Sequence, residues 1–286
     1  MSQAGIESEK IIRRNRDGEL KYQPDDLTIE EPLEIRIGRQ TVATTMRTPG
    51  QDDELAAGFL LSEGIIRSKE DIVKVSRPRS ARNRDNIIAV ELARDVKATT
   101  TLAKRFGTIT SSCGICGKES IAAIRQAMRP IESRMDVRMS EETLLTLPET
   151  LRAHQGDFAR TGGIHAAAVF ELDGTLKIVR EDIGRHNAVD KVIGGMLGYL
   201  PLNRHVLLVS GRASFEIVQK ALAAGIPIVA SVSAPSNLAV NFCRENNQTL
   251  VGFLRPPSFN LYSHVERVIL EPATGEKKVR SAKHAK

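Results

Sequence analysis

The chain has 286 residues, 41 of them lysine or arginine and 35 aspartate or glutamate, which gives a formal net charge of +6. Most of that excess comes from residues 277–286, which hold five basic residues and no acid, and aromatic residues make up only 4% of the chain, without tryptophan. A broad nucleic-acid-binding surface is therefore not expected. No apolar run is long enough to span a membrane and no secretory signal precedes the body, so we expect a cytoplasmic protein without a membrane partner.

The first third of the chain is predicted to hold a small α+β subdomain. Residues 1–26 are polar, without a sustained apolar period, and are predicted to be a mobile leader. The subdomain is predicted over 27–98. Its expected elements are a hairpin of strands 33–37 and 40–46 across Gly38-Arg39, an amphipathic helix over 54–66 and a strand at 87–92.

The remainder, 99–272, is predicted to be an α/β domain, followed by a disordered basic tail at 273–286. Ser140 to Thr143 carry a helix-start signal, and Asp173-Gly174 is a strong hairpin signal. Strands and helices then alternate to the end of the domain, which favours a partly parallel, layered sheet. The expected elements are a helix at 144–155, strands at 164–170, 176–180, 205–210, 226–231 and 249–253, and helices at 214–224 and 237–244.

Two of the three cysteines, Cys113 and Cys116, lie in a glycine- and serine-rich loop that leads into a helix-like stretch at 119–128. The free N–H groups at the start of a helix, and the charge of Lys118, favour the deprotonated thiol. Since the thiolate is the reacting species, this pair is a candidate nucleophile or sulfur carrier.

Other interpretations of the cysteine pair stay open. A structural zinc site needs two more ligands, which histidines can supply. A thioredoxin-like redox pair usually follows the first strand, whereas about a hundred residues precede Cys113. A structural disulfide is disfavoured by the reducing compartment expected for a chain with three cysteines. Cys243 lies in an apolar helical pattern and is predicted to be a buried small hydrophobic residue.

Polar residues also cluster at 161–165, 180–191 and 210–214, where predicted strands end and helices begin. Ligands bind at such positions in open α/β sheets. A helix that starts near Arg185 would place His186 and Asp190 one turn apart. The alternatives are partly buried structural histidines, an ion-pair network at a domain or subunit contact, and a simple tight turn.

These motifs together resemble the formate dehydrogenase accessory sulfurtransferase (FdhD) family. The resemblance is carried by Ser-Ser-Cys-Gly-Ile-Cys-Gly, Thr161-Gly-Gly-Ile-His-Ala-Ala-Ala168 and Arg180-Glu-Asp-Ile-Gly-Arg-His-Asn-Ala-Val-Asp-Lys191. It extends to Arg47-Thr-Pro-Gly, Gly58-Phe-Leu-Leu-Ser-Glu-Gly, Ser233-Ala-Pro-Ser-Asn-Leu-Ala and the stretch from Arg255 to Tyr262, and so covers residues 27 to 265.

The resemblance implies a sulfur carrier. Members of the family accept sulfur from a cysteine desulfurase as a persulfide and pass it to a molybdenum or tungsten bis-molybdopterin guanine dinucleotide before that cofactor enters formate dehydrogenase. By position, Cys113 matches the persulfide cysteine and Cys116 the second thiol. The implied fold is similar to the cytidine-deaminase layered α/β sandwich, with a smaller N-terminal part, in a homodimer. Because His165 is followed by three alanines instead of an acid, deamination is not supported.

Binding that acceptor requires cations for its pyrophosphates and polar groups for its guanines, which a guanine nucleotide would mimic. We expect the three polar clusters to form this pocket, with His186 and Asp190 aligning or polarising groups. The alternative is a non-catalytic zinc- or nucleotide-binding regulator that uses the C-x-x-C as metal ligands. The residues expected to bind the cofactor are Gly163, Arg185, His186 and Arg212 from the clusters and, from the resemblance, Phe253, Leu254, Arg255, Pro256, Pro257 and Ser258.

Overall fold

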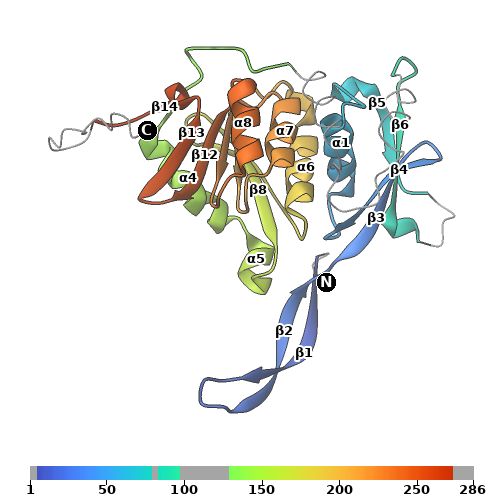
Figure 1. Cartoon of the computed structure of the whole chain (residues 1–286). Coiled ribbons are helices and arrows are strands. Elements are labelled where there is room, and N and C mark those ends of the chain that lie inside the picture. Colours follow the sequence, from blue (N-terminus) through green and yellow to red (C-terminus); the bar gives the residue numbers. More distant parts are fainter. Residues whose placement is uncertain (1–4, 79–82, 97–128, 273–286) are drawn as a thin grey trace.

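The computed structural model describes residues 5–78, 83–96 and 129–272 (Figure 1). The predicted cysteine loop and the predicted basic tail lie outside the described residues. Within the described parts, no helix is both long and apolar enough to cross a bilayer.

A six-stranded sheet forms the centre of the larger part, in the order β13-β12-β11-β10-β8-β9. Strands β10, β11 and β12 run parallel, whereas β8, β9 and β13 pair antiparallel with their neighbours. This confirms the predicted partly parallel α/β sheet, and the cytidine-deaminase-like layering stays a prediction. The strands span His165–Glu171 (β8), Leu176–Asp182 (β9), His205–Val209 (β10), Ile228–Ser231 (β11), Thr249–Arg255 (β12) and Ser258–Ser263 (β13).

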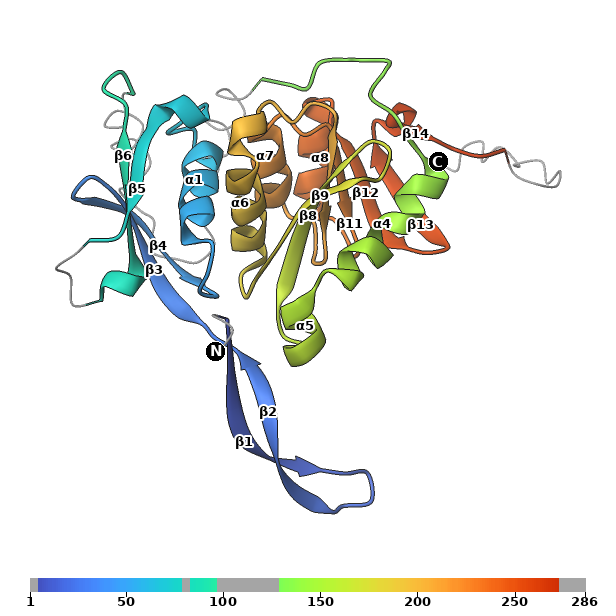
Figure 2. The same ribbon diagram turned by 180° about the vertical axis from the view of Figure 1, so that it is seen from behind.

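Helices cover both faces of this sheet (Figures 1 and 2). One face carries α6 (Arg185–Gly195), α7 (Phe215–Ala223) and α8 (Asn237–Glu245), and the other carries α4 (Glu141–Ala153). Each face has its own apolar core, because the side chains of each strand alternate between the two faces. Ser140 caps α4 by accepting a hydrogen bond from the Thr143 amide, as its helix-start signal predicted.

The smaller part is a four-stranded sheet in the order β4-β3-β6-β5. The predicted hairpin is confirmed as β3 (Glu31–Ile37) and β4 (Gln40–Arg47), and the strand predicted at 87–92 is β6 (Ile87–Leu92). Strand β5 (Ile72–Ser76) was not predicted. Three of its five residues are exposed and the other two are only partly buried, so the sequence carries little apolar signal there.

Helix α1 (Asp52–Ser62) lies between this sheet and α6 (Figure 1). The prediction of an amphipathic helix is wrong for α1, because eight of its eleven residues are buried. The backbones of α1 and α6 meet at two glycines. A Cβ placed on Gly58 would lie 1.9 Å from the Asp190 carbonyl oxygen, and one on Gly194 would lie 1.9 Å from that of Glu54. Glycine at these positions therefore allows the two helices to pack, and the small sheet is joined to the large one through this crossing.

The segment expected to be a leader instead forms a long β-hairpin, β1 (Ile6–Arg14) and β2 (Leu20–Thr28), which projects from the body (Figures 1 and 2). Its base is fixed to the short helix α5 (Gly156–Thr161). Thr28 bonds Thr161 across 3.0 Å, and Arg160 bonds Asp26 across 2.8 Å. Residues on both faces of this hairpin are mostly exposed, so its strands do not alternate between apolar and polar residues. The sequence therefore lacked the periodicity by which a strand is predicted.

The other elements are short connections. The parallel pair β7 (Met139–Ser140) and β14 (Val268–Ile269) lies at the start of α4. Single turns of 3₁₀ helix occupy Lys69–Asp71 (η1), Arg84–Asn86 (η2), Leu197–Tyr199 (η3) and Val265–Arg267 (η4).

Candidate functional site

The topology brings the three predicted polar clusters to one edge of the large sheet. Strand β8 begins there and β9, β10, β11 and β12 end there, while α6, α7 and α8 all begin there. The N-terminal ends of three helices, each with unsatisfied N–H groups and a positive dipole end, therefore point to the same side. We call this surface the strand-end edge; it comprises residues 162–165, 182–187, 210–216, 231–236 and 253–255.

His165, Gly211 and Arg185 meet at the centre of the strand-end edge. A Cβ on Gly211 would lie 3.3 Å from Nδ1 of His165 and 3.9 Å from Cβ of Arg185, so the lack of a side chain lets the His165 ring approach the backbone closely. The Nε of Arg185 is buried and has no hydrogen-bond acceptor among the described residues. A buried cationic donor without a partner is costly, which marks this position as one that an anionic ligand would satisfy.

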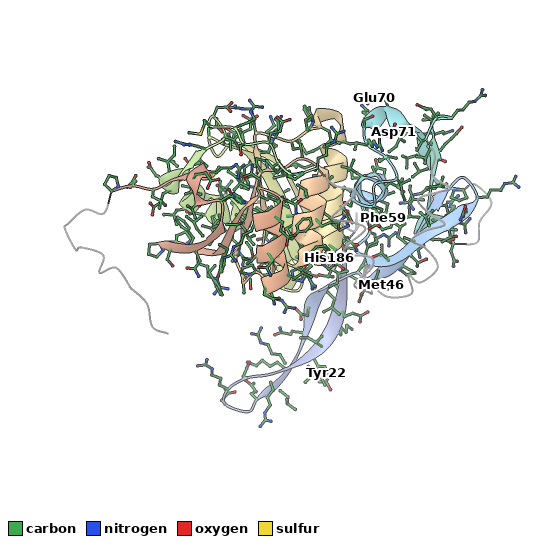
Figure 3. All side chains as sticks on the ribbon, turned by 45° about the horizontal axis from the view of Figure 1, so that its top comes forward. Tyr22, Met46, Phe59, Glu70, Asp71 and His186 are labelled. Carbon is green, nitrogen blue, oxygen red and sulfur yellow. The ribbon has the colours of Figure 1, made fainter. Side chains whose placement is uncertain are left out.

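His186 lies beside it, at the end of the helix layer nearest the hairpin (Figure 3). Its Nε2 is 2.8 Å from Oε2 of Glu216 and 3.2 Å from Oγ of Ser214, both from the start of α7. Burial raises the pKa of Glu216. The hydrogen bond and the charge of His186 lower it, as do the charges of Lys220 and Arg185, and together they leave this pKa below its usual value. Glu216 was not predicted from the sequence, because a single acid in the first turn of a helix is also what favourable helix-dipole interactions alone would produce.

The third part of the edge comes from the ends of β11 and β12. Ser231 Oγ donates to the Gly211 carbonyl (2.7 Å) and accepts from the Ser233 amide (3.1 Å). The Arg255 side chain folds back so that Nε donates to the Val232 carbonyl at 2.9 Å. Phe253 is a non-glycine residue in the left-handed region (φ 51°) with 42% of its surface exposed, a conformation that concentrates at functional sites.

The remaining predicted residues differ in how much of their surface a ligand could reach. Arg212 is exposed on the strand-end edge, and Gly163 lies in the loop between α5 and β8. Pro256 and Pro257 form the turn between β12 and β13, followed by the exposed Ser258. The side chain of Leu254 is fully buried in the second core, so only its main chain can face a ligand.

Several charged residues of the 180–191 cluster form buried or partly buried ion pairs beneath the edge, as the alternative of an ion-pair network predicted. Asp182 is completely buried and bonds Lys191 at 2.7 Å. It also accepts hydrogen bonds from the amides of Gly184 and Thr48. Lys191 donates to the Thr48 carbonyl at 2.9 Å. The network thus joins the Arg47-Thr-Pro-Gly motif to the loop that positions Arg185.

Asp190 corrects a prediction. Helix α6 does begin at Arg185, so His186 and Asp190 lie one turn apart as expected. However, the Asp190 carboxylate is buried and is bound by Lys220 at 2.7 Å and by Ser62 Oγ at 2.9 Å. Burial raises its pKa, and its partners act in the opposite direction. The carboxylate is therefore a packing anchor between α1, α6 and α7, and the expectation that it aligns a ligand is wrong.

A cavity of about 640 Å³ opens beside His165, bounded by the C-terminal part of α4, the loop after α5 and the ends of β9 and β10. Its lining includes the predicted Gly163 and His165, together with two polar residues that were not predicted, Arg152 from α4 and Gln155 from the connection between α4 and α5. Its size is within the range of small-molecule sites.

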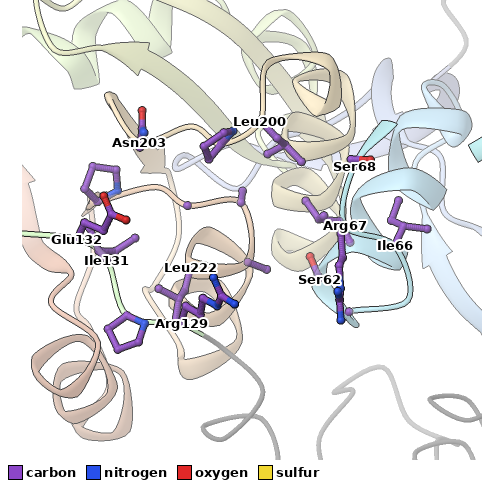
Figure 4. Close-up of a pocket in the computed structure, with 18 of the residues that line it drawn as sticks. Ser62, Ile66, Arg67, Ser68, Arg129, Ile131, Glu132, Leu200, Asn203 and Leu222 are labelled. Carbon is purple, nitrogen blue, oxygen red and sulfur yellow. The ribbon is translucent and has the colours of Figure 1, made fainter. Parts of the chain in front are cut away.

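A larger cavity, of about 980 Å³, lies at the opposite end of the sheet, where β10 and β11 begin (Figure 4). Its lining includes Arg67, Arg129, Glu132 and Asn203. Arg129 is the first residue described after the segment that contains the two paired cysteines. None of the predicted site residues that the structure describes lines this cavity.

Of the three cysteines, the structure describes only Cys243, which is fully buried with Sγ 3.5 Å from Oε1 of Gln248. Burial raises the pKa of its thiol, which makes it inert. The prediction of a buried small residue is confirmed. Cys113 and Cys116 lie outside the described residues, and their roles stay predictions.

Comparisons with known proteins agree with this organisation. Residues 28–269 match the model of the FdhD/NarQ family. The chain is 50% identical over 277 residues to "Sulfur carrier protein FdhD" of Streptomyces coelicolor, covering 94% of this chain and 98% of that one. It is 43% identical over 261 residues to the protein of the same name from Sulfolobus acidocaldarius, covering 91% and 97%.

The fold is shared with a crystal structure of a candidate formate dehydrogenase accessory protein from Desulfotalea psychrophila. The TM-score is 0.74 at 23% identity, covering 93% of this chain and all of that one. The match to the family model spans most of the chain, including every cluster of the strand-end edge. The chain therefore belongs to the FdhD/NarQ family.

Proposed function

We propose that this protein is a sulfur carrier that takes up sulfur from a cysteine desulfurase as a persulfide on Cys113. It delivers that sulfur to a molybdenum or tungsten bis-molybdopterin guanine dinucleotide that is destined for formate dehydrogenase. The names of the relatives support sulfur transfer. The observation that supports the acceptor is the strand-end edge, where three helix N-termini and the side chains of Arg185, Arg212 and Arg255 converge.

The strand-end edge suits the charged part of this substrate. Pyrophosphate oxygens accept hydrogen bonds from free helix N–H groups and from guanidinium groups, and both kinds of donor are present. Arg185, whose buried Nε has no acceptor among the described residues, lies next to Gly211 and His165 at its centre. Phe253 offers an exposed ring against which a guanine base can stack. The pterin and its metal are the substrate that these residues hold in place.

The sulfur chemistry balances with the two paired cysteines and a thiol reductant. The Cys113 thiolate attacks the terminal sulfur of the donor persulfide, and the donor cysteine leaves as a thiolate. For release, the Cys116 thiolate attacks Sγ of Cys113, and the terminal sulfur leaves as sulfide. The two cysteine sulfurs are oxidised to a disulfide while the transferred sulfur gains two electrons. A cellular thiol reductant then restores the dithiol.

Replacing Arg212 or Arg255 by glutamine is expected to lower the affinity for a guanine nucleotide roughly tenfold or more, because each loses a charge-assisted bond to phosphate. Isothermal titration calorimetry with GDP measures the affinity. Arg39→Gln is the matched control, since Arg39 is exposed at the β3–β4 turn, far from this edge. Unchanged affinity in both edge variants would exclude this surface as the nucleotide site.

GDP binding is also expected to tighten as the pH falls. Burial, followed by the charges of Arg185 and His186, holds the pKa of His165 below its usual value, so the free protein has a neutral ring at pH 7. A bound phosphate favours the protonated ring and so raises this pKa, which makes binding take up a proton. Calorimetry between pH 5.5 and 8 in buffers of different ionisation enthalpy measures the uptake. His165→Gln should remove this contribution, and an equal uptake in that variant would contradict the assignment.

A further inference from the structure

The cavity of about 640 Å³ beside His165 contains a buried amide that has no partner. Gln155 lines this cavity and has only 6% of its surface exposed. Its side chain does not cap α5, which follows it, and makes no hydrogen bond to any described residue. Neither amide atom is completely enclosed, so the small exposed part of the residue opens into the cavity. Since buried polar groups in folded proteins are almost always paired, this amide is available for a ligand.

The other polar groups of the cavity are mainly donors. Ser210 Oγ accepts one main-chain amide at 2.9 Å, and its hydroxyl has no acceptor among the described residues, so it can donate to a ligand. Arg152, which can only donate, lies over the Phe158 ring with Cζ 4.0 Å from the centroid, and this contact holds it in place. A neutral His165 ring adds one donor and one acceptor. Donors therefore outnumber acceptors, which suits a ligand with a carbonyl oxygen.

The remaining walls of the cavity are mostly apolar. Such walls can cover both faces of a flat ring, whereas a sugar or a phosphate would lose its hydration there without enough partners. A few placed polar groups within an apolar lining are typical of sites that recognise a small molecule by its edge. The apolar side chains of the lining belong to Pro148, Leu151, Phe158, Ile164, Ile183 and Val232.

We infer that this cavity binds a flat heterocycle with a lactam edge, in which a ring N–H lies next to a C=O group. Gln155 reads that edge: its Oε1 accepts the ring N–H, and its Nε2 donates to the ring oxygen. Guanine and pterin share this edge, so the inference rests on the proposed function and specifies it further. The cavity holds one ring of the cofactor, next to the strand-end edge that binds its phosphates.

The donors select a lactam over the edge of adenine. A glutamine amide can turn to match either order of donor and acceptor, so Gln155 alone does not distinguish the two kinds of ring. The hydroxyl of Ser210 and the guanidinium of Arg152 do, because both need an acceptor. A lactam oxygen has two lone pairs for such donors, whereas adenine would present the hydrogens of its amino group.

Gln155→Leu tests this assignment, since leucine has a similar volume and lacks the amide. Two probes are used: GDP, measured by calorimetry, and neopterin, a fluorescent pterin without a nucleotide, measured by fluorescence titration. We expect the affinity for at least one of them to fall tenfold or more. A loss confined to neopterin identifies the pterin as the ring in the cavity, and a loss of GDP affinity identifies the guanine.

Unchanged GDP affinity, together with unchanged or absent neopterin binding, would overturn this inference and leave the proposed function intact. A wild type that binds neither probe would contradict both. The stability of the variant separates recognition from packing. Gln155 has no partner to lose, so Gln155→Leu should leave the denaturation midpoint unchanged or raise it. A loss of binding that accompanies a loss of stability would show that Gln155 acts through packing, against the inference.

Asn203→Leu is the matched control. The Asn203 amide lines the larger cavity at the opposite end of the sheet, and it too has no hydrogen-bond partner among the described residues. This substitution also replaces an unpaired amide by an apolar side chain, but it is expected to change the affinity for neither probe. An equal loss of affinity in both variants would contradict the assignment to the cavity beside His165.

Discussion

Gly58→Ala is expected to destabilise the protein by about 3 kcal/mol, at the upper end of the effect of overpacking. The added methyl group would lie 1.9 Å from the Asp190 carbonyl oxygen, which is backbone and cannot rotate away. Helices α1 and α6 would have to separate, and the small sheet would lose its support. Gly194→Ala creates the reciprocal clash with the Glu54 carbonyl and should have an effect of the same size.

Chemical denaturation measured by circular dichroism gives the free energy of unfolding. Gly156→Ala is the control, because a Cβ at Gly156 meets no atom within 4 Å and its φ angle is not in the left-handed region. Its stability should stay close to wild type. If Gly58→Ala unfolds at the same denaturant concentration as wild type, the close packing of α1 on α6 described here is incorrect.

Lys191→Met is expected to destabilise the protein by about 3–5 kcal/mol, the typical effect of leaving one member of a buried ion pair without its partner. Asp182 is completely buried, and Lys191 is its only cationic partner among the described residues. The same carboxylate holds the Gly184 amide at 2.8 Å, directly before α6. We therefore expect weaker GDP binding as well, since Arg185 follows that residue.

Lys177→Met provides the contrast. Lys177 also bonds a carboxylate at 2.9 Å, that of Glu171, but this pair lies at the surface. Surface ion pairs contribute little to stability, so the denaturation midpoint should not change measurably. Equal effects of the two substitutions would show that burial of the Asp182–Lys191 pair has no energetic consequence.

Sequence patterns predicted the buried elements well. The four inner strands of the large sheet, β8, β10, β11 and β12, have mostly apolar runs, and the 33–46 hairpin has alternating residues around a glycine turn. The edge strand β13, which mixes polar and apolar residues, was not predicted. The β1–β2 hairpin was not predicted because strands with both faces exposed carry no apolar period. Helix α1 was predicted to be amphipathic but is buried on two sides, against the small sheet and against α6. Such burial depends on tertiary contacts, which the local apolar periodicity does not encode.

The strand-end edge could be predicted in outline, since strand ends that precede helices meet at one side of a parallel sheet. The direction in which each side chain points could not be predicted from the sequence. Asp190 and His186 are one turn apart, yet Asp190 is bound by Lys220 from α7, which lies 30 residues further along the chain. The pairing of His186 with Glu216, and the close approach of Gly211 to His165, likewise depend on residues that are distant in sequence.

The central claim is that Cys113 carries the sulfur, and intact-protein mass spectrometry after incubation with a cysteine desulfurase and L-cysteine tests it most directly. Wild type, Cys113→Ala and Cys116→Ala are compared with and without a reductant. Wild type and Cys116→Ala are expected to gain the mass of one sulfur atom, which the reductant removes, and Cys113→Ala is expected to gain none. Equal sulfur loading of Cys113→Ala, or no loading of wild type together with tightly bound zinc on its thiols, would contradict the account.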